Sequence, residues 1–444
     1  MGNRYLEGPF APATEEITTY DLPVTGRIPV ELNGRYLRNG PNPLGLEDAA
    51  AYHWFVGSGM VHGIRLREGR AEWYRNRWVR SKAVAEALNE QWTPGPLFSD
   101  IDAAPNTSVI GHAGRTFALG EGGATPYELG YELDSLGPSD FGGTLPGTYS
   151  AHTKRDPETG ELHAVAYFWG WPHVQYSVLD ATGAITRTVD IPVADSPLVH
   201  DLALTARYAV IYDLPITFSM DLAMGGSPFP YAWNDAHPAR VGLLPRDGDA
   251  DSIRWFDVEP CWVFHTLNAY DDGERVVIDL VKFPKMLQEG RLDDNPPPVL
   301  ERWTLDPQDG KVHQETLDDR AQEYPRIDER LSSRPHRFGY TVSGLGTFQP
   351  KSGEAILKRD FTTGLTETHA FPAGHAVSEA VFAPAGPATP EDDGYLLSLV
   401  ANPDRAATDL VILSAQDIAG SPVAVIHLPI RVPLGLHGSW IPDL

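Results

Sequence analysis

The chain contains one cysteine, Cys261, among its 444 residues. A single thiol excludes an internal disulfide framework and a cysteine-rich zinc site. No window holds the roughly 18 consecutive apolar residues that a membrane-spanning helix needs, and residues 1–9 show no signal-peptide core. These absences predict a cytoplasmic protein in a reducing compartment.

Positive charge is scarce. The 35 lysines and arginines face 60 aspartates and glutamates, which gives a formal net charge of -25. A field of this sign repels nucleic acid and anionic surfaces, and the basic residues form no runs that would offset it. The charge therefore excludes a nucleic-acid partner and favours a neutral or apolar substrate.

The common catalytic signatures are also missing. The chain has no Walker A loop, no Gly-x-Gly-x-x-Gly, no His-Glu-x-x-His and no Gly-x-Ser-x-Gly. His313 and Glu315 form a His-x-Glu pattern that could be half of an iron site. It follows a polar turn, and short patterns of this kind arise readily by chance, so we do not interpret it as a ligand pair.

Helix signals are few, and turn signals are many. The 42 glycines and 39 prolines separate short runs rich in valine, isoleucine and aromatic residues, which is strand composition. Turns that begin with aspartate and end with glycine recur at 156–160, 180–183, 306–310 and 360–364. Repeated hairpins predict an all-β sandwich, barrel or propeller, and a chain of this length favours a propeller formed by a single domain, 1–444. The repeats are too irregular to count blades.

One segment, 213–233, breaks the strand pattern because it is apolar yet rich in glycine and proline. We expect a loop or short helices that cap one face of the fold. Such a cap could line a tunnel or touch lipid, or it could be a covered loop of the core.

Four of the fifteen histidines follow small or apolar residues: His152, His200, His265 and His437. Any one of them alone would be read as a satisfied core histidine. Four such positions spread along the chain are what a propeller could bring to its axis. His437 begins the apolar tail 437–444, which follows a strand-like run at 423–428, so we expect this tail to be tied into the core.

Taken together, the motifs resemble those of the carotenoid cleavage oxygenases, a family that also includes stilbene-cleaving dioxygenases and the retinal isomerohydrolase. The resemblance covers almost the whole chain. The segments that carry it are 32–43, 53–55, 57–63, 106–107, 118–123, 151–152, 156–161, 323–326, 391–395 and 431–440.

The resemblance implies a seven-bladed β-propeller with a loop or helix cap over an axial Fe(II) site. The implied residues are four histidine ligands (His152, His200, His265, His437), three glutamates around them (Glu121, Glu323, Glu379) and a threonine near an open coordination position (Thr107). Four neutral imidazoles leave the 2+ charge of the ion uncompensated, so glutamates that accept the other ring N–H would offset it and fix each tautomer.

The implied activity is a dioxygenase reaction in which O2 cleaves a conjugated C=C bond of a small apolar carotenoid or apocarotenoid into two carbonyl products. Alternatives are cleavage of a stilbenoid or phenylpropenoid olefin, a metal-dependent isomerase or hydrolase, and a non-catalytic binding propeller. Stilbene cleavers tend to carry lysine, and carotenoid cleavers tryptophan, where this chain has Gly120. We therefore expect a roomier site. Peripheral membrane contact and the oligomeric state stay open.

Overall fold

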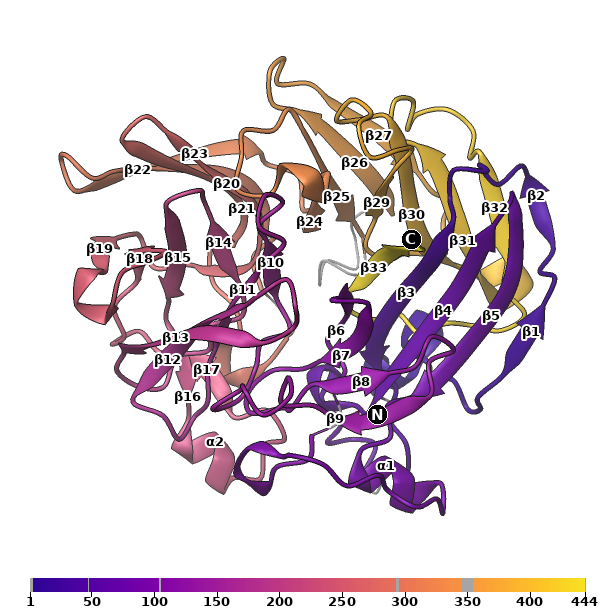
Figure 1. The fold of residues 1–444 in the computed structure, drawn as a ribbon, viewed down its shortest axis with the longest axis horizontal. Coiled ribbons are helices and arrows are strands. Elements are labelled where there is room, and N and C mark those ends of the chain that lie inside the picture. The colour runs from indigo at the N-terminus through magenta and orange to yellow at the C-terminus, as the bar shows by residue number, and fades with distance from the viewer. Residues whose placement is uncertain (1–2, 47, 104, 293–294, 345–353, 444) are drawn as a thin grey trace.

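The structure is a computed structural model, and it describes residues 3–46, 48–103, 105–292, 295–344 and 354–443. The strands of these residues form seven antiparallel sheets, set like blades around a central axis (Figure 1), and one separate two-stranded sheet. This confirms the seven-bladed β-propeller that the resemblance implies.

Five blades each use four strands, and in each of them the first strand lies nearest the axis (Figure 1). Blade 2 holds β6 (Ser108–His112), β7 (Arg115–Leu119), β8 (Tyr127–Leu129) and β9 (Ser135–Pro138); blade 3 holds β10 (Thr153–Arg155), β11 (Leu162–Ala166), β12 (His173–Leu179) and β13 (Ile185–Pro192); blade 4 holds β14 (Leu202–Leu204), β15 (Tyr208–Asp213), β18 (Arg240–Pro245) and β19 (Arg254–Asp257); blade 5 holds β20 (Trp262–Asp272), β21 (Arg275–Phe283), β22 (Val299–Asp306) and β23 (Lys311–Asp318); blade 6 holds β24 (Glu323–Arg326), β25 (Phe338–Ser343), β26 (Ala355–Asp360) and β27 (Thr366–Ala370).

Blades 1 and 7 combine strands from both halves of the sequence. Blade 1 holds β33 (Gly438–Pro442), β3 (Gly34–Pro41), β4 (Gly59–Arg67), β5 (Arg70–Trp78) and β1 (Thr18–Tyr20); blade 7 holds β28 (Ala376–Val377), β29 (Val381–Pro384), β30 (Gly394–Asn402), β31 (Ala407–Ser414), β32 (Ala424–His427) and β2 (Val24–Gly26). Because β33 adds to β3 while β1 and β2 edge neighbouring blades, both ends of the fold close the ring. The described part of the tail is thus tied into the core, as expected.

The packing between blades follows from the two-residue period of a strand. All eight residues of β3 are buried. Tyr36 packs with blade 7 residues such as Leu397, whereas its neighbour Leu37 packs with blade 2 residues such as Val109. Since both faces of the blade are covered, its strands carry apolar residues on both sides rather than in strict alternation.

The apolar segment 213–233 lies largely outside the blades (Figure 1). Its β16 (Ile216–Phe218) and β17 (Tyr231–Trp233) pair as an antiparallel hairpin, and α2 (Met220–Met224) lies between them. Ser219 caps α2 by accepting a hydrogen bond from the Leu222 amide. The expected short helix is present, but the hairpin was not expected.

The remaining helices are short and lie in the connections. They are α1 (Lys82–Ala87) and the 3₁₀ turns Arg4–Leu6, Gly8–Phe10, Trp54–Val56, Phe98–Asp100, Ala250–Ser252, Gln288–Gly290, Glu329–Leu331 and Pro403–Arg405. Among the described residues, no helix has the length and apolar character needed to cross a membrane.

Ring closure is expected to depend on Gly34. A Cβ atom at Gly34 would lie 2.5 Å from the carbonyl oxygen of Ile441 and 2.8 Å from Pro442 Cα, so Gly34→Ala must push β33 away from β3. We expect it to lower the free energy of unfolding by about 1–3 kcal/mol, as measured by chemical denaturation. Gly130→Ala is the control, because the nearest atom to its new Cβ would be 3.6 Å away. Equal stability of the two variants would contradict the idea that ring closure depends on the close approach of β33 to β3 at Gly34.

Candidate metal centre

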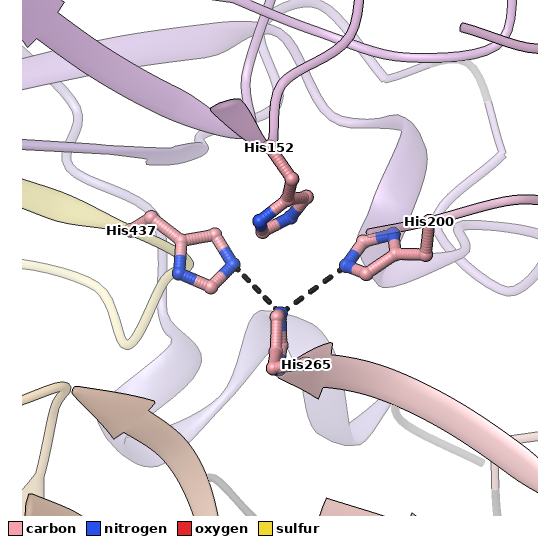
Figure 2. Close-up of side chains that lie close together, drawn as sticks. All are labelled: His152, His200, His265 and His437. Carbon is pink, nitrogen blue, oxygen red and sulfur yellow. Dashed lines mark hydrogen bonds between the residues drawn. The ribbon is translucent and has the colours of Figure 1, made fainter. Parts of the chain in front are cut away.

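The four histidines singled out in the sequence meet on the propeller axis (Figure 2). Each offers one ring nitrogen, and these nitrogens all lie within 4.8 Å of one another. His152 directly precedes β10, His200 comes two residues before β14, His265 lies within β20 and His437 directly precedes β33. Innermost strands of four different blades therefore place the group.

Three glutamates surround the histidines. The Nδ1 atom of His200 lies 2.9 Å from Glu121 Oε2, that of His265 lies 2.6 Å from Glu323 Oε2, and that of His437 lies 3.0 Å from Glu379 Oε1. His152 differs, because its Nε2 atom lies 3.6 Å from Glu121 Oε1, which is too far for a hydrogen bond. The structure thus brings together the histidines and glutamates named from the sequence.

The remaining blades also reach the axis with their innermost strands. Glu323 begins β24 of blade 6, Glu379 lies between β28 and β29 of blade 7, and Thr107 directly precedes β6 of blade 2. The Thr107 carbonyl accepts a hydrogen bond from the His437 amide at 3.1 Å, which joins blade 2 to the strand that closes the ring. Every blade therefore contributes one of these residues to the site.

The ring nitrogens are arranged as a cation site. If each Nδ1–H donates to its glutamate, the Nε2 atom carries a lone pair and no proton. Yet Nε2 of His265 lies 3.2 Å from Nε2 of His200 and 3.1 Å from that of His437 (Figure 2). Two nitrogens about 2.1 Å from one metal ion and at right angles to each other would be about 3.0 Å apart, so the donor set fits a metal ion.

Burial and charge set the protonation of the site. Burial, together with the neighbouring histidines, holds the pKa values of His152 and His265 well below the usual range, so both are neutral at neutral pH. Burial also opposes a charge on His200, but Glu121 outweighs it and raises the pKa of His200. Burial raises the pKa of Glu323 to about 8. Burial acts in the same direction on Glu379, but Arg326 and His437 overcome it and lower its pKa to about 2.

Metal affinity is expected to rise with pH. Below their raised pKa values His200 and Glu323 both hold protons, and a bound metal needs a neutral imidazole and an ionised carboxylate. Both protons must then leave, so affinity should increase by up to about tenfold per pH unit per proton as the pH rises, and the contribution of Glu323 should level off above about pH 8. Calorimetric titrations at a series of pH values would measure the slope, and Glu323→Gln should reduce it. A flat profile would refute the two-proton assignment.

A cavity of about 770 Å³ leads to one side of the histidines. His200, His265, Thr107 and Glu121 border it. Most of the wall is aromatic or aliphatic, and its aromatic residues include Phe55, Tyr167, Phe218, Phe229, Tyr231 and Phe264. The segment 213–233 supplies Phe218 and Tyr231 to this wall, so of the roles left open for it the structure supports the lining of a cavity. Such a wall suits a long apolar ligand.

A second cavity, of about 800 Å³, also borders the histidines. His265 and His437 line both cavities, whereas His152 and Glu379 line only the second. Charged side chains such as Lys154 and Asp201 line it, and these two form an ion pair at 2.8 Å. The two approaches to the site therefore differ in polarity.

Gly120 lies in the wall of the apolar cavity, but it leaves less space than expected. A Cβ atom there would lie 2.9 Å from Ala124 Cβ and 3.0 Å from Pro105 Cα. The neighbouring chain thus occupies the position of the missing side chain, and the room in the cavity comes from elsewhere in its wall.

Sequence reasoning missed two tyrosines at the site. Tyr167 donates a hydrogen bond to Glu121 Oε2 at 3.1 Å, and Tyr324 stacks on His265 with ring centroids 5.5 Å apart. Tyr324 directly follows Glu323 and could have been noticed, but nothing near Tyr167 in the sequence marks it. His313 lies in β23 at the outer edge of blade 5 and belongs to no metal-ligand group among the described residues.

Comparison with known proteins gives consistent matches. Residues 10–442 match the family model described as retinal pigment epithelial membrane protein. A carotenoid cleavage oxygenase from Mycobacterium tuberculosis is 46% identical, and the match covers 99% of this chain and 98% of that protein.

Solved structures agree with the sequence matches. The lignostilbene dioxygenase of Pseudomonas brassicacearum superimposes with a TM-score of 0.89 at 27% identity, covering 99% of both chains. The cobalt-substituted apocarotenoid oxygenase (ACO) of Synechocystis gives a TM-score of 0.86 at 27% identity over 97% of each chain. Both superpositions extend over nearly the whole of this chain.

Proposed function

Because the chain belongs to the family of the carotenoid cleavage oxygenases and the retinal pigment epithelial membrane protein, we propose that it is a non-haem Fe(II) dioxygenase. Its reaction is the cleavage of a conjugated C=C bond of a carotenoid or apocarotenoid by O2 into two carbonyl products. The observation that carries the proposal is the group of four histidines at the end of a cavity with a largely apolar wall.

The proposed ligands are His152, His200, His265 and His437. Four imidazoles leave coordination positions open, and imidazole suits iron among several transition metals. Glu121, Glu323 and Glu379 would compensate the charge of the ion and hold the rings in place. When bound, Fe(II) supplies the redox-active centre at which O2 can react with an olefin.

Thr107 is proposed to shape the open side of the site. Its hydroxyl donates to Asn106 Oδ1 at 3.0 Å, so the hydroxyl is engaged in the protein. Its methyl group is then the part left to limit access to the open coordination positions. Asn106 is itself held by the carbonyl groups of Phe55 and Gly57, which fixes the orientation of the threonine.

The cavity is proposed to bind and orient the olefin. Its aromatic wall would exclude water and hold a conjugated chain by apolar contact, and the strongly negative protein disfavours an anionic substrate. Cleavage of one olefin by one O2 into two carbonyl groups is balanced without an external reductant. We propose that residues 1–444 act as one domain, because all seven blades contribute to this site.

A second candidate substrate is a stilbenoid or phenylpropenoid olefin. The close structural similarity to a lignostilbene dioxygenase favours it. A shorter olefin of this kind would give aromatic aldehydes by the same cleavage.

The test uses full-length protein loaded anaerobically with Fe(II). An apocarotenal and a hydroxylated stilbene are supplied in parallel with O2, and O2 uptake and aldehyde products are measured. One O2 consumed per olefin cleaved would support the dioxygenase, and the faster substrate would identify the class. Conversion of substrate without O2 uptake would instead establish an isomerase or hydrolase, and the absence of any conversion by metal-loaded protein would oppose the proposal.

A further inference from the structure

The three glutamates at the centre are held in two different ways. Glu323 Oε2 accepts a hydrogen bond from the backbone amide of Tyr324, and Glu379 Oε2 accepts one from the amide of Gly438 at 2.8 Å. Glu121 has no such backbone donor among the described residues. Its Oε2 atom accepts instead from the hydroxyl of Tyr167 at 3.1 Å.

Glu121 also lies between two histidines. Its Oε2 atom is 2.9 Å from Nδ1 of His200, while its Oε1 atom is buried without a hydrogen-bond partner among the described residues and lies 3.6 Å from Nε2 of His152. A small rotation of the carboxylate would let Oε1 accept a hydrogen bond from an N–H at that Nε2 atom. The Nε2–H tautomer of His152 could not offer this nitrogen to a metal.

Tyr167 is well placed to prevent this rotation. It directly follows β11 of blade 3, it is 5% exposed, and its ring meets that of Tyr231 edge to face with centroids 5.9 Å apart. Both rings belong to the wall of the apolar cavity. The packing of the wall therefore fixes where the Tyr167 hydroxyl points.

We propose that Tyr167 is a positioning residue for the metal centre. Its hydroxyl holds Glu121 turned toward His200, so that His200 keeps its proton on Nδ1 and Nε2 of His152 stays free for the metal. The inference rests on the proposed metal centre. It adds that one wall residue of the substrate cavity controls a metal ligand through a carboxylate.

The test is the affinity of the metal-free protein for Co(II), with anaerobic Fe(II) as a second probe. Tyr167→Phe keeps the ring and removes only the hydroxyl. We expect the dissociation constant to rise about 5- to 10-fold, at the low end of the effect of residues that orient a metal-bound histidine. Tyr340→Phe is the matched control, because its buried hydroxyl has no partner among the described residues and it lines neither cavity. The affinity of the Tyr340→Phe variant for Co(II) should equal that of the wild type.

A double-mutant cycle with Glu121→Gln shows whether Tyr167 acts through Glu121. If it does, Tyr167→Phe should have little further effect in the Glu121→Gln background. Wild-type affinity in Tyr167→Phe, or an undiminished effect of it in that background, would overturn this inference while the metal centre stands. A wild-type protein that binds neither ion would overturn the metal centre and the inference together.

Discussion

Replacing His265 with alanine is expected to remove the bound metal and to abolish olefin cleavage. The Nε2 atom of His265 lies 3.2 Å from that of His200 and 3.1 Å from that of His437. The substitution therefore removes the imidazole that is close to both of these histidines. We expect metal affinity to fall more than about 100-fold, beyond the range for residues that only orient a ligand. Elemental analysis and O2 uptake with substrate measure the two effects.

The variant should still fold. The partner left behind, Glu323, has a pKa raised by burial to about 8, so it is largely uncharged at neutral pH in the metal-free protein. Loss of metal would then not reflect an unpaired buried charge. His313→Ala is the control, since His313 lies on the outer strand β23. About one metal ion per chain and normal turnover in His265→Ala would refute the four-histidine site.

The second large effect is expected for Glu379→Gln. The carboxylate of Glu379 accepts from His437 and Gly438 and faces Arg326 at 3.4 Å, and it is 3% exposed. Its pKa of about 2 is lower than that of an ordinary glutamate, so its charge stabilises the folded state. This contribution, about 3 kcal/mol at neutral pH, is lost as the pH falls from about 4.3 toward 2.

The amide variant lacks that charge at every pH. We therefore expect Glu379→Gln to lower the unfolding free energy of the metal-free protein by about 2–3 kcal/mol and to weaken metal binding about 10- to 100-fold. Denaturant unfolding and metal titration measure the two quantities.

Glu323→Gln is the matched comparison. Since Glu323 is largely neutral without metal, its amide should change stability by less than about 1 kcal/mol, while metal binding weakens as in Glu379→Gln. Equal destabilisation by the two substitutions would contradict the difference in charge between these glutamates.

The all-β class could be predicted from composition and turns, but the number of blades could not. Innermost strands range from two residues in β28 to eleven in β20, so no fixed period marks a blade. Blades 1 and 7 also draw strands from both ends of the fold, and the pairing of β33 with β3 joins positions about four hundred residues apart, from Gly34 with Pro442 to Arg38 with Gly438. Only the family resemblance supplied the number seven.

The residues of the candidate site differ in how far the sequence alone could predict them. The apolar surroundings of His265 and His437 were visible in the sequence, whereas a buried glutamate such as Glu323 reads like surface charge until its position on the axis is known. Tyr167 could not be found at all, because its partner Glu121 lies 46 residues away along the chain. The hairpin around α2 was hidden because its two strands have only three residues each.

The order of the histidines along the chain has a consequence for protein synthesis. During synthesis, His152, His200 and His265 emerge from the ribosome long before His437. His437 also directly precedes β33, the strand that closes the ring. Domains begin to fold as the nascent chain emerges, yet a chain halted anywhere between residues 265 and 437 holds only three of the four imidazoles and an open ring. Interrupted translation products should therefore lack the complete four-histidine site.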